Sequence, residues 1–131
     1  MTKDREGPIH RAILQYLRMQ YPGALIFHPA NEIASKMPGA TDMRRMLAQK
    51  RAKAMGMLPG VGDLIMLHRG SFYMFEVKAP GNYQQKNQHE VQAVVEANGG
   101  RYFVVRSIDD VREAMWGASD VVSVPMRGEI S

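Results

Sequence analysis

The chain has 131 residues, of which 45% are hydrophobic, so it can form one globular core but is too short for two. It has no cysteine, which excludes disulfides, thiolate catalysis and cysteine-ligated zinc sites. Its apolar runs are too short to cross a bilayer, and no apolar segment follows the first six residues. We therefore expect a cytoplasmic protein without membrane contact. A formal net charge of +4 is compatible with binding nucleic acid but does not establish it.

Two elements and a loop are expected before residue 41. A helix is predicted from Pro8 to about Met19, because proline suits the first helical position and apolar residues then recur at helical spacing. A short buried strand follows over residues 24–27. The loop that begins at His28 contains Asn31 and Glu32, which are candidate substrate contacts because loops on rigid scaffolds often carry function.

A second helix is predicted from Thr41 to Met55, with Thr41 as its N-cap. Four apolar residues have the spacing of a buried stripe, namely Met43, Met46, Leu47 and Ala54. Five of the 17 basic side chains lie here, namely Arg44, Arg45, Lys50, Arg51 and Lys53. A charge run is usually a solvated face, but no acidic residue follows Asp42 within this helix. We therefore favour contact with DNA phosphates.

A β-hairpin is predicted next, since two apolar runs over residues 64–67 and 72–77 flank a turn that contains Gly70. A symmetric turn places Asp63 opposite Glu76. Because side chains alternate between faces, Asp63, Glu76 and Lys78 emerge together at one end of the hairpin. A divalent cation would relieve the repulsion between the two carboxylates.

The alternative for this hairpin is a solvated end at which Glu76 and Lys78 form a surface ion pair of little energetic value. Apolar residues on both faces of the hairpin favour an interior strand pair instead. The Gly60-x-Gly62 turn, which permits close backbone approach just before Asp63, favours the same interpretation.

The remaining elements are a helix from about residue 84 to Asn98 and a buried strand over residues 102–105. A strand–helix–strand unit of this kind favours parallel pairing. A last helix, capped by Ser107, is expected to end near Trp116. Residues 117–131 are interpreted as a tail or subunit contact, in which residues 121–124 form an edge strand or an interface.

The series Pro59-Gly60-x-Gly62-Asp63, then Glu76-x-Lys78, then a glutamine-bearing helix resembles the PD-(D/E)xK nuclease superfamily. More narrowly, it resembles the VRR-NUC family, whose virus-type members are small stand-alone domains. The resemblance extends from about Glu6 to about Ala114. The Val-Arg-Arg triplet of the family is Val105-Arg106-Ser107 here, so its second arginine is missing.

This resemblance implies an α/β fold with a restriction-endonuclease-like mixed sheet flanked by helices, in a single nuclease domain over residues 1–131 with its core at about 6–116. It implies Mg²⁺ or Mn²⁺ bound by Asp63, Glu76, the Val77 carbonyl and Glu6. Glu6 is equally well interpreted as an acid stabilised by the helix dipole. The family has a glutamine four residues after this glutamate, where this chain has His10.

The implied activity is metal-dependent, structure-selective DNA endonuclease cleavage of branched DNA such as Holliday junctions by a homodimer. Lys78, beside two carboxylates, would position the attacking water, and Gln88 would orient Lys78 or that water, unless Gln88 is simply a solvated residue at a helix start. A non-catalytic nucleic-acid-binding module is the alternative. A phosphohydrolase of small nucleotides is disfavoured by the basic helix and by the lack of a glycine-rich phosphate loop.

Overall fold

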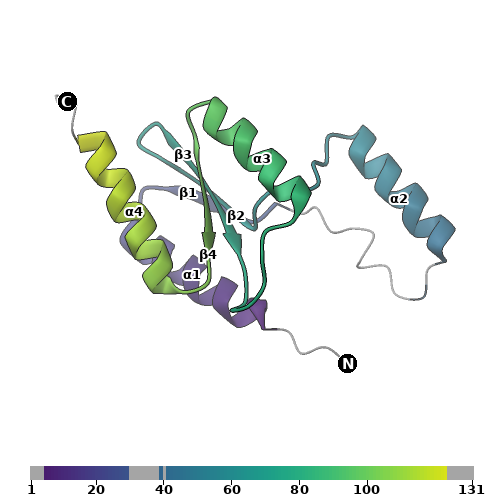
Figure 1. Ribbon diagram of the computed structural model, residues 1–131, viewed down its shortest axis with the longest axis horizontal. Helices are drawn as coiled ribbons and strands as arrows, with labels where there is room; N and C mark the ends of the chain where they lie inside the picture. Colours follow the sequence, from purple (N-terminus) through teal and green to yellow (C-terminus); the bar gives the residue numbers. More distant parts are fainter. Residues whose placement is uncertain (1–4, 30–38, 40, 124–131) are drawn as a thin grey trace.

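The computed structural model describes residues 5–29, 39 and 41–123. Within them the elements, in chain order, are α1 (Glu6–Gln20), β1 (Leu25–Phe27), α2 (Asp42–Ala54), β2 (Leu64–His68), β3 (Ser71–Val77), α3 (Lys86–Ala97), β4 (Arg101–Val105) and α4 (Ile108–Ser123). The described strands form one mixed sheet with helices on both faces (Figure 1). This arrangement confirms the predicted α/β fold.

The sheet has the strand order β1-β2-β3-β4. The β1–β2 and β2–β3 pairs are antiparallel, whereas β3 and β4 are parallel and joined through α3. Ile65 pairs with Met74 and Leu67 with Phe72, which is the register that the symmetric turn predicts. Both the hairpin and the parallel crossover are therefore confirmed, and the register brings Asp63 and Glu76 to the same end.

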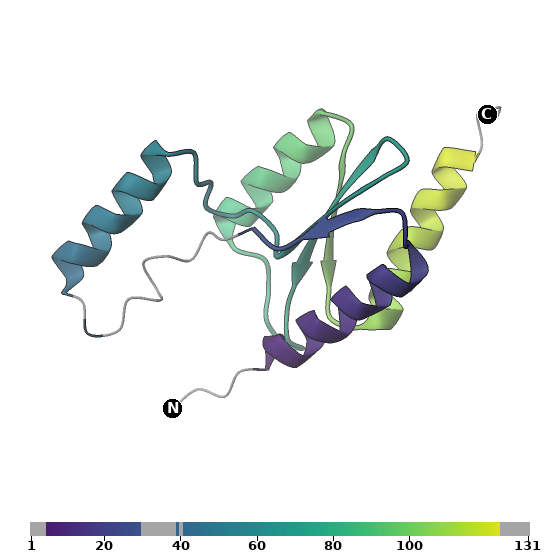
Figure 2. The same ribbon diagram turned by 180° about the vertical axis from the view of Figure 1, so that it is seen from behind.

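Two apolar layers hold the sheet between its helices. On one face, Ile13 and Leu17 of α1 and Val111 of α4 pack with Phe75. On the other face, Val91 of α3 packs in a smaller cluster with strand residues of β3 and β4. Figures 1 and 2 show α1 and α4 on one side of the sheet and α3 on the other. The polar end of the hairpin lies where β2 begins and β3 ends.

Helix α2 stands apart from this sandwich in both views (Figures 1 and 2). Thr41 accepts a hydrogen bond from the Arg44 amide at 3.1 Å, which confirms the predicted N-cap. The predicted buried stripe is wrong within this chain, because Met43, Met46 and Leu47 are exposed and the helix has no buried residue. The helix presents this stripe to solvent instead of to the sheet.

The ends of two helices differ from the prediction. Helix α1 begins two residues before Pro8, since proline is tolerated throughout the first helical turn. Helix α4 continues past Trp116 to Ser123, so the edge strand proposed for residues 121–124 is wrong over 121–123. Asn31, Glu32 and Val124 lie outside the described residues. None of the described helices combines the length and apolar character that crossing a bilayer requires.

Two glycines allow the turn before Asp63 to pack tightly. Gly60 has a φ of +89°, and a Cβ there would collide with the backbone of Asn87 at the start of α3. A Cβ on Gly62 would lie 2.6 Å from the Met74 Cγ and 2.9 Å from the Phe75 carbonyl oxygen. The close backbone approach expected from the Gly60-x-Gly62 turn is thus confirmed.

Gly62→Ala should lower the free energy of unfolding by about 1–3 kcal/mol, because the added methyl group overpacks the contact with β3. Chemical denaturation would measure this loss. The matched control is Gly23→Ala, whose added methyl group meets no atom within 4 Å. Equal stability of the two variants would contradict the close packing of the turn on β3.

Candidate active site

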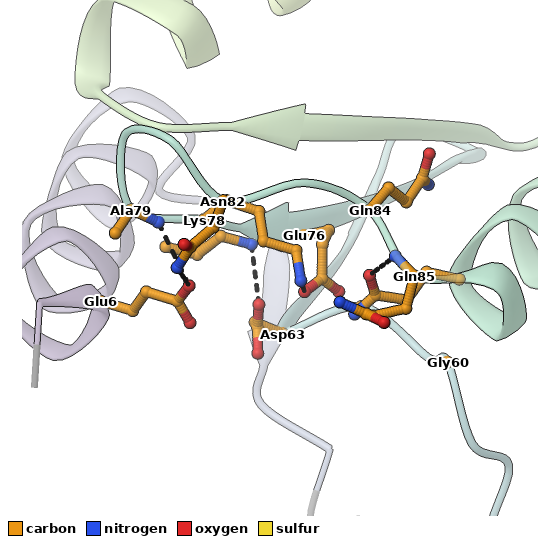
Figure 3. Close-up of polar contacts among 12 residues, drawn as sticks. Glu6, Gly60, Asp63, Glu76, Lys78, Ala79, Asn82, Gln84 and Gln85 are labelled. Carbon is orange, nitrogen blue, oxygen red and sulfur yellow. Dashed lines mark hydrogen bonds and ion pairs between the residues drawn. The ribbon is translucent and has the colours of Figure 1, made fainter. Parts of the chain in front are cut away.

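The end of the hairpin gathers Asp63, Glu76 and Lys78 (Figure 3). Asp63 lies just before β2, and its Oδ2 accepts a hydrogen bond from the Val77 amide at 2.7 Å. Glu76 lies in β3, and Lys78 directly follows this strand. The Lys78 Nζ lies 3.4 Å from the Glu76 Oε2. Three residues that the sequence singles out are therefore neighbours in space.

The Glu76–Lys78 pair is buried. Glu76 is 4% exposed and Lys78 is 8% exposed. The second carboxylate oxygen of Glu76, Oε1, is buried without a hydrogen-bond partner in the described structure. A buried carboxylate oxygen without a partner is costly, so the interpretation of this pair as a solvated surface ion pair is wrong.

The environment raises the pKa of both carboxyls. Burial, followed by repulsion from Asp63, raises the pKa of Glu76 to about 8 despite the attraction of Lys78. Burial likewise raises the pKa of Asp63, which the Val77 amide and the charge of His10 counteract in part. An additional positive charge here would favour the ionised forms of both carboxyls.

Glu6 reaches the same site from the first turn of α1. Its Oε2 accepts hydrogen bonds from the Ala79 amide and the Asn82 side chain, each at 3.2 Å (Figure 3). Glu6 and Asp63 also line a common cleft of about 340 Å³. Glu6 therefore has tertiary contacts in addition to its favourable position at a helix N-terminus, whereas its role as a metal ligand stays a prediction.

Two histidines line this cleft beside the carboxylates. The His28 Nδ1 lies 2.6 Å from the backbone carbonyl oxygen of Asp63, and the His10 and His28 rings meet edge to face at 5.0 Å. The sequence indicates His28 only as the start of a loop. Strand pairing could have located it, because Phe27 pairs with Ile65 and an antiparallel ladder brings the next residue beside Leu64 and Asp63.

Arginines hold the loop that follows Lys78. The Arg106 Nη2 donates to the Asn82 carbonyl at 2.8 Å, and its guanidinium lies 6.0 Å from the centre of the Tyr83 ring. The Arg5 Nη2 donates to the Pro80 carbonyl at 2.6 Å. Arg106 therefore fixes a loop whose Asn82 contacts Glu6.

Ser107 and Gln88 both act in helix caps. The Ser107 Oγ accepts a hydrogen bond from the Asp110 amide at 3.0 Å, which confirms the predicted cap of α4. The Gln88 Oε1 accepts a hydrogen bond from the Gln85 amide at 2.7 Å, at the start of α3. The orientation of Lys78 or of a water molecule by Gln88 stays a prediction.

The basic residues of α2 lie outside the cluster of Asp63, Glu76 and Lys78. This helix carries five basic side chains and one acidic side chain, so it accounts for the whole formal net charge of +4 of the chain. Asp42 forms an exposed ion pair with Arg45 at 3.3 Å, and no further acidic residue follows Asp42 in the helix. Contact of the helix with DNA stays a prediction.

The side chains present fit a hard divalent cation with few protein ligands. No group of three or more His, Cys, Asp and Glu residues in the described part of the chain is arranged to hold a metal ion. Asp63 and Glu76 nevertheless offer oxygen ligands, and the buried Glu76 Oε1 lacks a partner. Mg²⁺ is commonly held by one or two carboxylates, with water and substrate phosphate completing its coordination.

Solved structures of VRR_NUC domains share this fold. One, named "VRR_NUC domain protein", superimposes with a TM-score of 0.60 and 16% identity over 89% of each chain. Another, named "VRR_NUC domain", has a TM-score of 0.56 and 19% identity over 86% of this chain and 96% of its own. No family model and no curated protein matches the chain. The predicted VRR-NUC resemblance is thereby confirmed for the fold.

The metal-free protein should lose stability as the pH rises. Glu76 binds its proton more tightly in the folded state, where its pKa is about 8, than in the unfolded state, where it titrates near its ordinary value of 4.5. The resulting stabilisation is fully present below pH 4.5 and is lost as the pH rises through 8. Between pH 5 and 9 the Tm of the wild type should fall by at least about 5 °C more than that of Glu76→Gln.

Differential scanning calorimetry in a chelating buffer would measure these Tm values. Glu90→Gln, at an exposed position on α3, is the control and should follow the wild type. Identical pH profiles for Glu76→Gln and the wild type would contradict the raised pKa of Glu76.

Proposed function

We propose that this protein is a nuclease of the VRR-NUC family that hydrolyses phosphodiester bonds in DNA with the help of Mg²⁺ or Mn²⁺. The observation that carries the proposal is the buried Glu76 carboxylate. It lies beside Lys78 and Asp63, and one of its oxygens has no hydrogen-bond partner in the described structure. The fold is shared by solved domains named VRR_NUC. A divalent cation would satisfy that oxygen and relieve the charge that raises the pKa of both carboxyls.

In this proposal Asp63 and Glu76 hold the cation, together with the Val77 carbonyl and Glu6. Such an ion, when bound, lowers the pKa of a water molecule and neutralises charge on the scissile phosphate. The Asp63 carboxylate is held in place by the Val77 amide. Lys78 lies within 3.4 Å of Glu76, from where its ammonium would position the attacking water and stabilise charge that develops on the phosphate. Gln88 would orient Lys78 or the water.

We further propose that branched DNA is the preferred substrate and that a homodimer cuts it. The described part of one chain forms one Asp63–Glu76–Lys78 cluster, whereas resolving a four-way junction requires two nicks on opposing strands. A two-fold dimer offers two such clusters and matches the symmetry of the junction. Five basic residues on α2, namely Arg44, Arg45, Lys50, Arg51 and Lys53, would contact the phosphates.

Asp63→Asn should lower the rate of cleavage by at least about 100-fold. The change removes a negatively charged ligand and so weakens binding of the cation that would stabilise charge on the reacting phosphate. Gel assays on duplex, flap and four-way-junction DNA with Mg²⁺ would measure this rate. DNA affinity should change little, since contacts with phosphate elsewhere dominate binding.

Asp109→Asn, at an exposed position on α4, controls for the loss of one carboxylate and should cut at the wild-type rate. Cleavage by Asp63→Asn at the wild-type rate would refute the site. A wild-type protein that binds DNA but never cuts it, whichever metal is supplied, would favour the non-catalytic binding module.

Replacing Arg44, Arg45 and Arg51 with alanine should weaken DNA binding and flatten its dependence on salt. Each lost phosphate contact changes the slope of log K against log salt by about 0.9 on duplex DNA. Fluorescence anisotropy across a salt series would give the slope. An equal loss of charge at Arg18, Arg101 and Arg112 is the control, and equal slopes in the two triple variants would show that α2 is a solvated face.

A further inference from the structure

The apolar stripe of α2 lacks a covering surface in the described structure. Met43, Met46 and Leu47 lie at helical spacing on one side of the helix and are 64%, 64% and 51% exposed. The half-buried Ala48 and Ala52 lie on the opposite side. A helix of 13 residues is marginal in water without tertiary packing, so this stripe needs an apolar partner.

A second apolar surface is open on the sheet. Leu25 pairs directly with Leu67, and Phe27 pairs with Ile65, so these four side chains share one face. This is the face on which Ile65 packs toward the α3 cluster. Leu25, Phe27 and Leu67 are 59%, 43% and 42% exposed. No described element covers the β1–β2 part of this face.

We propose that α2 of one copy docks its Met43–Met46–Leu47 stripe on the Leu25–Phe27–Leu67 patch of a second copy, and reciprocally. This exchange deepens the homodimer of the proposed function, on which it rests, by naming the two surfaces that meet. The partner is a second copy of this chain because both surfaces belong to it. A two-fold axis would use each of them once in each copy.

The connection from α2 to β2 directs the helix away from its own sheet. Gly60 lies against the backbone of Asn87 at the start of α3, and Val61 packs in the α3-side cluster. The end of α2 is thereby held beside α3, and both views show the helix projecting from the body beyond α3 (Figures 1 and 2). The Met43–Met46–Leu47 stripe and the Leu25–Phe27–Leu67 patch of one chain are both exposed, so α2 in this position does not cover the patch of its own chain.

The two surfaces match in size. Thirteen helical residues extend about 20 Å, and a five-residue strand such as β2 extends about 17 Å. With about 200 Å² for a fully exposed large side chain, the six side chains expose on the order of 600 Å². Two symmetric dockings that cover these six side chains completely in each copy would bury about 1,200 Å², which is the lower end of the range for specific interfaces.

The absence of cysteine from this chain makes a direct test possible. Leu47→Cys protein is mixed with Leu67→Cys protein, and a short bifunctional thiol cross-linker is added. We expect a covalent dimer that joins residue 47 of one copy to residue 67 of the other, as peptide mapping would show. Gln49→Cys, on another side of α2, replaces Leu47→Cys in the control and should give little cross-linking.

Light scattering supplies a second measurement. The wild type should have twice the chain mass of 14.7 kDa, and Met46→Glu with Leu47→Glu should shift it toward the monomer. An intramolecular link in the Leu47→Cys, Leu67→Cys double variant would show α2 on its own sheet and overturn the exchange. A wild-type monomer, or a dimer linked only through identical positions, would overturn it as well.

The outcome for cleavage is separate. A wild-type monomer that cuts DNA overturns the exchange and leaves the nuclease proposal in place. A cross-linked 47–67 dimer that cuts no DNA supports the exchange and contradicts the nuclease proposal.

Discussion

The burial of Glu76 beside Lys78 is the constraint on which the rest of the site depends. Two charged groups taken out of water must satisfy each other and still leave no polar atom without a partner. Here one carboxylate oxygen of Glu76 lies beside the Lys78 ammonium, and the other has no hydrogen-bond partner among the described residues. The packing of β3 between β2 and β4 enforces this arrangement, since every residue from Tyr73 to Ala79 is buried. The fold therefore keeps an unfavourable arrangement of charges at the C-terminal end of β3.

The scaffold and the charged surface are separate parts of the molecule. The sheet, α1, α3 and α4 share two apolar layers and position the carboxylates. Helix α2 contributes no residue to either layer and carries the whole net charge of the chain. The side chains that would act on a phosphate must be held in fixed positions. Nonspecific attraction of DNA does not require the basic helix α2 to be held as tightly.

Much of the scaffold could be predicted because local rules decide it. The register of the hairpin follows from two apolar runs and Gly70, and the Ser107 and Thr41 caps follow from residue type and position. The site was predicted as far as it depends on that register, which brings Asp63, Glu76 and Lys78 together. Long-range contacts do not follow from local rules. The spacing of Met43, Met46 and Leu47 predicts a buried stripe, yet all three are exposed, and the contact of His28 with Asp63 depends on the pairing of β1 with β2.

The contacts around Glu6 join segments that are far apart in the sequence. Glu6 and Asn82 are separated by 76 positions, and the loop of Asn82 is in turn held by Arg106. During synthesis, the hydrogen-bond donors of Glu6 at Ala79 and Asn82 are therefore added 73 and 76 residues after Glu6 itself. A nascent chain that ends before β4 lacks both Arg106 and the strand that covers one edge of β3. The order of synthesis thus delays the completed site until the fold around it is almost whole, and an incomplete chain does not present it.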